Sequence, residues 1–248
     1  MTRFGRLDAE FGVALRSFLR RRTAVFFTFL FPTILVVIFG ALVQTDPGSG
    51  GLFAESPAYY VPGYVAVVVL FTPLSRMSSE VARHREGNRF EKLATTPLQR
   101  SEWLAAHVAV NVAIVGLAAA LILGLVVALT GAPLGDVWLL PLFLVPGIVG
   151  FCGIGTILGR VTDSRDGAVA ASNTIGLPLL FLSNTFVPPS QLPGWFGPIV
   201  NLSPLTYFAR GARSAMYGGG SPWFDLAVLS GFAVLAFAVA AVAIPQTD

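Results

Sequence analysis

The sequence predicts an all-α integral membrane protein with six transmembrane helices. Of its 248 residues, 54% are apolar and only 12% are charged, about half the charged share of a soluble domain. The mean hydropathy is +0.74. The apolar residues form runs of roughly 20, the length a helix needs to cross the hydrocarbon core. Backbone amides in lipid must pair within their own segment, so these runs have to be helical, and the short alternating segments of a barrel are absent. We expect residues 1–248 to form a single transmembrane domain.

The first element expected is an amphipathic helix over residues 2–22. Its apolar side chains recur every three or four positions, as in Phe4, Leu7 and Phe11, and arginines occupy the other side. Such a helix suits the membrane interface, where its apolar face can enter the lipid. The alternative is a positively charged flank that only orients the first span.

Six apolar runs then provide the spans. The second contains Pro62 and Pro73, so the sequence defines its ends least. In the fourth, Gly155 and Gly159 have the GxxxG spacing that lets helices approach closely. The fifth carries several hydroxyl and amide side chains, which should face another helix or an aqueous path. The predicted spans are residues 23–43, 59–77, 103–129, 137–158, 168–187 and 224–244.

Two connections differ from ordinary loops. Residues 78–100 carry charges of both signs and favour a short helix on the cytoplasmic face, with a plain solvated loop as the alternative. Residues 188–221 are apolar but contain five prolines, so they cannot form one spanning helix. Short helices over 192–200 and 204–217 are expected there, re-entrant or lying on the outer membrane face.

The basic residues predict the orientation. Six precede the first span, six lie between residues 76 and 102, and two lie between the fourth and fifth spans. The links 44–58 and 130–136 contain none. By the positive-inside rule, both termini are cytoplasmic and residues 188–221 lie outside, in a multi-pass protein of the plasma membrane.

The sequence gives little support to chemistry within the chain. A Walker loop needs a lysine after glycine, and the sole lysine, Lys92, lies between Glu91 and Leu93. The only histidines, His84 on a polar loop and His107 near a span start, lack zinc-site spacing, and there is one cysteine. Acidic residues lie in links and tails, which disfavours ion-coupled transport. We expect no catalytic residue, no metal site and no cofactor bound by this chain; an intramembrane enzyme using a histidine is the disfavoured alternative.

Two motifs carry a family resemblance. The first runs from Arg85 through Glu86-Gly87-Asn88-Arg89-Phe90-Glu91-Lys92-Leu93 to Thr96-Pro97. The second comprises Asn184-Thr185-Phe186-Val187-Pro188-Pro189, Leu192-Pro193-Gly194-Trp195 and Asn201-Leu202-Ser203-Pro204-Leu205-Thr206-Tyr207. In order and place they resemble the coupling segment and the outward re-entrant region of type-2 ABC exporter permeases, the family that includes daunorubicin-resistance-type exporters. Asn88 stands where that family usually has threonine.

The resemblance implies a permease subunit that exports a hydrophobic or amphipathic substrate. It would pair with a second permease copy or homologue, with membrane lipid and with two copies of a cytoplasmic ABC ATPase, which holds the ATP and Mg; nucleic acid has no part. Phe90 and Leu93 would anchor the segment in a hydrophobic groove, and Gly87 would permit a bend. The residues expected to couple to the ATPase are Arg85, Glu86, Gly87, Arg89, Phe90, Glu91, Lys92, Leu93, Thr96 and Pro97.

A translocation path is expected along the second and fifth spans. Its candidate residues are Asn173, Phe181, Asn184, Thr185 and Phe186. For the two phenylalanines, packing against lipid or core is the alternative. The alternative function is an ATP-independent channel or scaffold.

Overall fold

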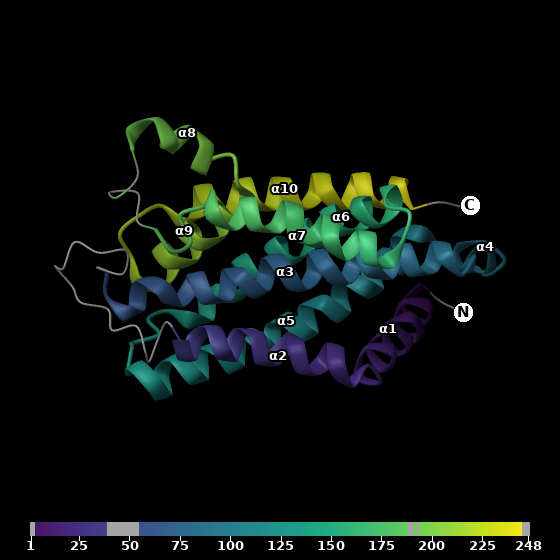
Figure 1. Ribbon diagram of the computed structural model, residues 1–248, viewed down its shortest axis with the longest axis horizontal. Coiled ribbons are helices and arrows are strands. Elements are labelled where there is room, and N and C mark those ends of the chain that lie inside the picture. The colour runs from purple at the N-terminus through teal and green to yellow at the C-terminus, as the bar shows by residue number, and fades with distance from the viewer. Residues whose placement is uncertain (1–2, 39–54, 188–190, 192, 245–248) are drawn as a thin grey trace.

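The computed structural model describes residues 3–38, 55–187, 191 and 193–244, and every regular element in these ranges is helical (Figure 1). Short 3-10 turns, η2 (Val137–Leu139) and η4 (Gly194–Phe196), join some of the helices. The helices are α1 (Arg3–Leu19), α2 (Arg22–Val36), α3 (Pro57–Glu86), α4 (Arg89–Ala94), α5 (Arg100–Thr130), α6 (Leu140–Val161), α7 (Arg165–Phe181), α8 (Gly197–Val200), α9 (Pro204–Tyr217) and α10 (Pro222–Ala243).

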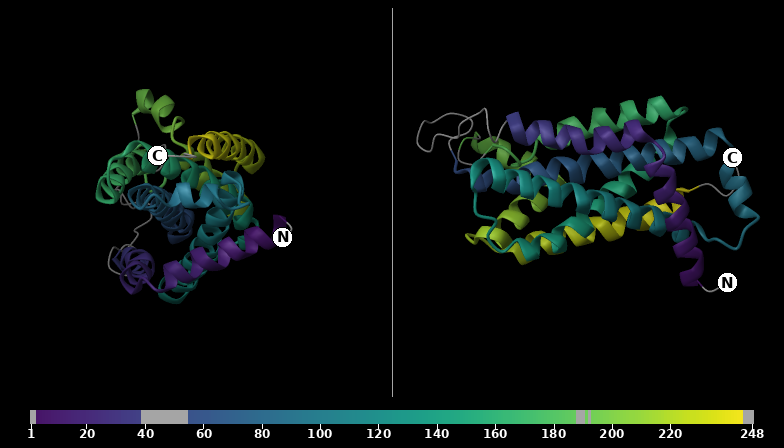
Figure 2. Two further views of the ribbon diagram at one scale, coloured as in Figure 1. Left: turned by 90° about the vertical axis from the view of Figure 1, so that its right-hand side faces the viewer. Right: turned by 90° about the horizontal axis from the view of Figure 1, so that it is seen from below.

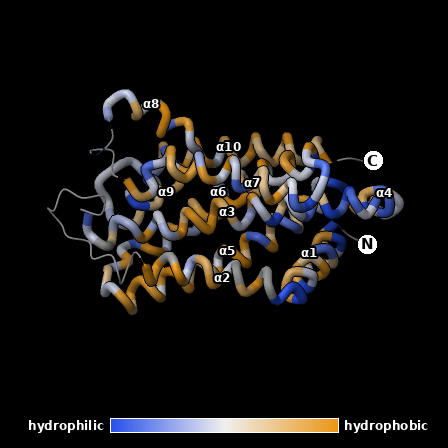
Figure 3. Tube along the Cα trace, in the orientation of Figure 1, coloured by the Kyte–Doolittle hydropathy of each residue, from blue (hydrophilic) through white to orange (hydrophobic). Residues whose placement is uncertain are grey.

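The long helices run side by side along one axis, and the two ends of the bundle differ. One end carries α1, α4 and both termini, and we call it the α4 end; α8 and α9 mark the opposite, α9 end (Figure 1). At the α4 end, α1 runs across the direction of the long helices instead of along it (Figure 2). Hydrophilic residues gather on α1 and α4, whereas hydrophobic stretches run along α5, α6 and α10 (Figure 3).

Four helices are long and apolar enough to cross a membrane: Ala58–Glu86, Arg100–Thr130, Val137–Val161 and Pro222–Ala243. They correspond to the predicted second, third, fourth and sixth spans, so the chain is a multi-pass membrane protein. Helices α2 and α7 lie along the same bundle but are shorter (Figure 1). Part of the first predicted span, residues 39–43, lies outside the described residues. The six-span count therefore stays a prediction.

Two helices have ends that differ from those of the predicted spans. Helix α3 does not end at residue 77 but continues to Glu86, with Pro62 and Pro73 inside it. Packing against neighbouring helices keeps it continuous despite the lost hydrogen bonds. The fifth predicted span reaches residue 187, yet α7 ends at Phe181 and residues 182–187 are not helical. The proline pair at 188–189 disfavours helical backbone in the residue before it, and the chain leaves the helix several residues earlier.

Helix α3 is central, and its contact with α6 confirms the close approach expected from the glycines. A Cβ atom added at Gly155 or Gly159 would collide with the carbonyl oxygen of Leu74 or of Ser78, so the two helix backbones touch. Ser78 also joins α3 to α7, because its hydroxyl lies 2.6 Å from that of Ser172. Helix-to-helix bonding, one of the two roles expected for polar groups in the fifth span, thus applies to Ser172.

Two short helical pieces lie where the sequence predicts them, and their re-entrant placement stays a prediction. Helix α9 spans Pro204–Tyr217, the range expected, and η4 with α8 falls within the expected 192–200 piece. Four residues of this region, 188–190 and 192, lie outside the described residues.

Candidate functional site

The turn between α3 and α4 depends on Asn88 rather than on Gly87. Asn88 has a left-handed backbone (φ 48°, ψ 36°), the only such non-glycine residue in the described ranges. The chain does turn at residues 87–88, but Gly87 has φ −98°, which any residue can adopt, so the turn does not require a glycine there. Asparagine tolerates the left-handed region better than other side chains with a Cβ, which explains its presence here.

Phe90 anchors α4, as expected, but in a groove of its own chain. It is buried, with its ring centroid 5.4 Å from that of Trp103 and 5.3 Å from that of His84. Leu93 is half-buried on the same side. Both border a hollow of about 680 Å³ that extends to Ile244 beyond the end of α10. Phe90 therefore connects α4 to α3 and α5 and is not free to enter a partner.

Arg85 and Glu86 attach the coupling segment to the α6–α7 turn. Arg85 donates from Nη1 to the carbonyl oxygens of Arg160 (2.7 Å) and Thr162 (2.8 Å), at the carboxyl end of α6. Glu86 Oε1 accepts from the backbone N–H of Arg165 (2.7 Å), at the amino end of α7. Both charges complement the helix ends that they meet. These two residues act inside the chain.

The remaining predicted coupling residues form an exposed charged face. Arg89, Glu91 and Lys92 all point to solvent, and within the described residues none of them forms an ion pair. Thr96 and Pro97 are exposed as well, and the Thr96 hydroxyl donates to the carbonyl oxygen of Leu93. This face is available to a partner.

Helix α1 is tied to α5 by an ion pair that the sequence analysis missed. Glu102 accepts from Arg6 Nε (3.0 Å) and Nη2 (2.6 Å), and from the backbone N–H of Gln99 (3.0 Å). The hydrogen bond to Glu102 raises the pKa of Arg6. Gln99 and Glu102 have the capping-box spacing, a signal visible in the sequence, whereas nothing local indicates the partner 96 residues away.

His84 and His107 lie together, which corrects the placement of His84 on a loop, whereas His107 lies near the start of α5 as predicted. Both are buried, on α3 and α5, with ring centroids 6.2 Å apart. His107 Nε2 lies 3.3 Å from Glu10 Oε1 on α1, and Glu80 pairs with Arg83 and, at 3.7 Å, with Arg21. No group of three or more potential metal ligands occurs in the described chain. The cluster is an ionic junction of α1, α3 and α5.

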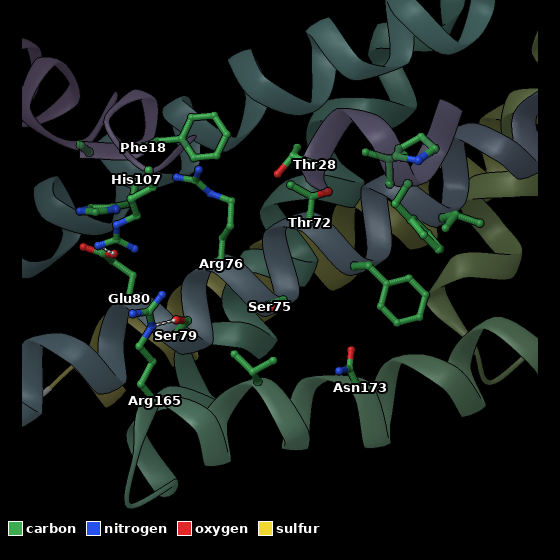
Figure 4. Close-up of a pocket in the computed structure, with 18 of the residues that line it drawn as sticks. Phe18, Thr28, Thr72, Ser75, Arg76, Ser79, Glu80, His107, Arg165 and Asn173 are labelled. Carbon is green, nitrogen blue, oxygen red and sulfur yellow. Dashed lines mark hydrogen bonds and ion pairs between the residues drawn. The ribbon is translucent and has the colours of Figure 1, made fainter. Parts of the chain in front are cut away.

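A cavity of about 650 Å³ separates α1 and α2 from α7, with α3 as its floor (Figure 4). Asn173 projects from α7 into it, and Arg76 rises from α3 towards Phe18 (Figure 4). The lining residues are Ala14, Ser17, Phe18, Arg21, Thr28, Phe31, Pro32, Val67, Val68, Phe71, Thr72, Ser75, Arg76, Ser79, Glu80, His107, Arg165, Val169, Asn173, Leu177 and Leu180.

The other predicted path residues do not reach this cavity. Phe181 is 75% exposed on the outside of α7. Asn184 and Thr185 are buried at the α9 end, where their carbonyl oxygens accept from Arg213 (3.5 and 3.4 Å). Phe186 packs beside Tyr64, with ring centroids 6.1 Å apart. Of the five predicted path residues, only Asn173 lines the cavity. Phe181 faces outward, and residues 184–186 pack at the α9 end.

Acidic residues are not confined to links and tails. Glu80 and Glu102 lie within α3 and α5, and Asp225 is buried in the first turn of α10. Arg210 donates to both Asp225 oxygens (3.0 Å from Nε and 2.6 Å from Nη2), and this hydrogen bonding raises the pKa of the arginine. Each of these carboxylates has an arginine partner.

Comparison with known proteins gives two matches. Residues 12–217 match the family described as ABC-2 type transporter. Over 203 residues the sequence is 30% identical to the daunorubicin resistance ABC transporter permease protein DrrB1 of Streptomyces coeruleorubidus. That alignment covers 78% of this chain and 69% of the relative.

Proposed function

Because this chain belongs to the ABC-2 type transporter family, we propose that it is the permease subunit of an ATP-driven exporter in the plasma membrane. In the proposed assembly it pairs with a second permease copy or homologue and with two copies of a cytoplasmic ABC ATPase, which carries ATP and Mg. One observation supports this most: α4, which carries the exposed charges, is joined through direct contacts of its own and the preceding residues to the helices around the cavity. This agrees with the family resemblance of the coupling segment.

The proposed transmission starts at Arg89, Glu91 and Lys92, which face outward and are unpaired within the described chain. A push on α4 reaches α5 through the contact of Phe90 with Trp103. It reaches the α6–α7 turn through Arg85 and Glu86. Helix α3, with 30 residues and a length of about 45 Å, then carries the displacement along the cavity floor. Closure of the ATPase dimer would thereby change the separation of α2 and α7.

The proposed orientation places the α4 end in the cytoplasm. The basic residues before α2, after the midpoint of α3 and in the α6–α7 turn all belong to this end (Figure 3). Both termini then lie inside the cell and α8 and α9 outside. The cavity would open at the cytoplasmic side, where a hydrophobic or amphipathic substrate could enter from the membrane.

The experiment exchanges charges on the exposed face of α4. Glu91→Arg combined with Lys92→Glu leaves the net charge unchanged and touches no internal contact. We expect the purified variant to be inserted and folded, but to retain less of the ATPase and to lose ATP-dependent transport in proteoliposomes. The matched control exchanges charges in the neighbouring turn, Arg160→Glu with Asp163→Arg, and should retain both.

Unchanged ATPase binding and transport in the α4 variant would contradict the proposed coupling. Solute movement by the purified chain alone, down a gradient and indifferent to nucleotide, would instead favour an ATP-independent channel.

A further inference from the structure

The cavity between α2 and α7 has an excess of positive charge. Three arginines line it against a single carboxylate, Glu80. Arg21 pairs with Glu80 at 3.7 Å, and Arg165 donates from Nε to the Ser79 hydroxyl at 2.9 Å. Glu80 is also shared with Arg83 and lies 3.5 Å from His84. The negative charge of Glu80 is therefore already shared among Arg21, Arg83 and His84. The remaining positive charge makes the cavity favourable for an anion.

Arg76 is the cavity arginine for which the described chain supplies no polar partner. Its guanidinium lies over the Phe18 ring, 4.3 Å from the centroid, and its buried Nε has no hydrogen-bond partner. Across the described part of the chain Arg76 forms neither a hydrogen bond nor an ion pair. A guanidinium removed from water without a paired anion costs free energy, and an ionisable residue on a membrane helix marks a functional site. An incoming anion would recover that cost.

The rest of the cavity suits an apolar body. Away from the charged end, its walls are formed by Phe31 of α2, Val68 and Phe71 of α3, and Leu177 and Leu180 of α7. A volume of about 650 Å³ falls within the roughly 300–1,000 Å³ typical of small-molecule sites. The charged and apolar regions are continuous, with Arg76 between them (Figure 4).

We infer that the cargo of the proposed exporter is an anionic amphiphile, whose carboxylate, sulfate or phosphate pairs with Arg76 while its apolar part fills the space between α2 and α7. That the anion is exported rests on the proposed function, whereas its binding at Arg76 does not. Guanidinium and oxyanion form paired charge-assisted hydrogen bonds, which select an acid over a neutral analogue of the same shape. A cationic amphiphile would meet three arginines and a carboxylate that is already shared.

Binding is tested on the full chain in phosphatidylcholine nanodiscs, without ATPase or nucleotide. The probes are 11-(dansylamino)undecanoic acid and its primary amide, which differ only in the charged group, and binding is followed by dansyl fluorescence. We expect the acid to bind about tenfold or more tightly than the amide. Arg76→Gln should remove this preference and Arg76→Lys should retain part of it. Arg165→Gln, a matched change at a cavity arginine that already has a partner, should retain most of it.

Two results would overturn the inference. One is equal binding of acid and amide to the unaltered chain. The other is an Arg76→Gln variant that keeps the preference of the unaltered chain for the acid. Displacement of the acid when phosphatidylglycerol is added to the nanodiscs would keep the anion site but assign it to a membrane lipid, and so would reject an exported cargo. A melting curve without probe checks that each variant is folded.

Transport distinguishes this inference from the proposed function. In proteoliposomes with the ATPase, ATP-dependent export of the acid but not the amide is expected. ATP-dependent export of a neutral or cationic amphiphile alone would retain the exporter and reject the anionic cargo. Binding of the acid at Arg76 without any ATPase association would instead retain the anion site and reject the ATP-driven exporter.

Discussion

The two sides of α3 are built in opposite ways. Towards α6, the helix backbones touch at Gly155 and Gly159, and α6 meets α10 similarly where Gly153 lies against the Ala236 backbone. Towards α2, a cavity of about 650 Å³ separates the helices. A backbone contact without side chains between has little room to slide, whereas a cavity can change volume. We infer that α3, α6 and α10, with α7 bonded to α3 through Ser78 and Ser172, keep their mutual distances and move as one body, whereas α1 and α2 change their separation from it.

The largest expected effect comes from breaking the fixed side. In Gly155→Ala the new Cβ would meet the Leu74 carbonyl oxygen at 2.5 Å, so α3 and α6 must separate. We expect a loss of about 2–3 kcal/mol of stability, in the range of overpacked cores. Gly124→Ala is the control, because nothing lies within 4 Å of the added Cβ there. Thermal unfolding in detergent compares the two, and equal midpoints would show that the fixed side is not tightly packed.

An intermediate effect is expected from releasing α1, the helix that closes one edge of the cavity. Glu102→Gln removes the negative charge that accepts both hydrogen bonds of Arg6, so the charge-assisted pair is lost. We expect faster hydrogen exchange in α1, unchanged exchange in α6, and weaker transport. Arg3→Gln is the control, since that side chain is 75% exposed and lies 4.0 Å from Glu102. Slowed or unchanged exchange in α1 would argue that the apolar contact of Phe18 with α5 alone holds the helix.

The smallest effect concerns the link from α3 to α4, which belongs to neither side. Asn88→Val places a β-branched residue in the left-handed region and should cost about 1–2 kcal/mol, whereas Asn88→Gly should be neutral or stabilising. Gly87→Ala should change little, because Gly87 has a negative φ. Denaturation midpoints rank the three variants. A larger loss of stability for Gly87→Ala than for Asn88→Val would show that the turn depends on Gly87 rather than on Asn88.

The sequence was informative where a feature repeats along one element. Run lengths predicted the long helices. The spacing of Gly155 and Gly159 predicted a close helix contact, though not α3 as the partner, and the charges of residues 78–100 predicted a short helix, which is α4. It was uninformative where partners are distant in sequence. Nothing near Phe90 indicates Trp103, and nothing near Glu102 indicates Arg6. Whether a charged side chain meets a partner or a helix end depends on tertiary packing, so Arg85 and Glu86 could not be separated from Arg89 and Glu91 beforehand.

The account depends most on a fixed and a moving side, and a distance measurement tests this directly. In a Cys152→Ala background, which removes the sole cysteine, spin labels are placed at exposed sites by Ile34→Cys with Leu177→Cys, across the cavity. A second labelled pair, Val145→Cys with Leu235→Cys, reports on α6 and α10. Pulsed electron–electron double resonance on the reconstituted complex should show that the distance between the labels at positions 34 and 177 changes when ATP is bound. The distance between the labels on α6 and α10 should stay constant. A constant cavity distance, or an equal shift of both pairs, would contradict the account.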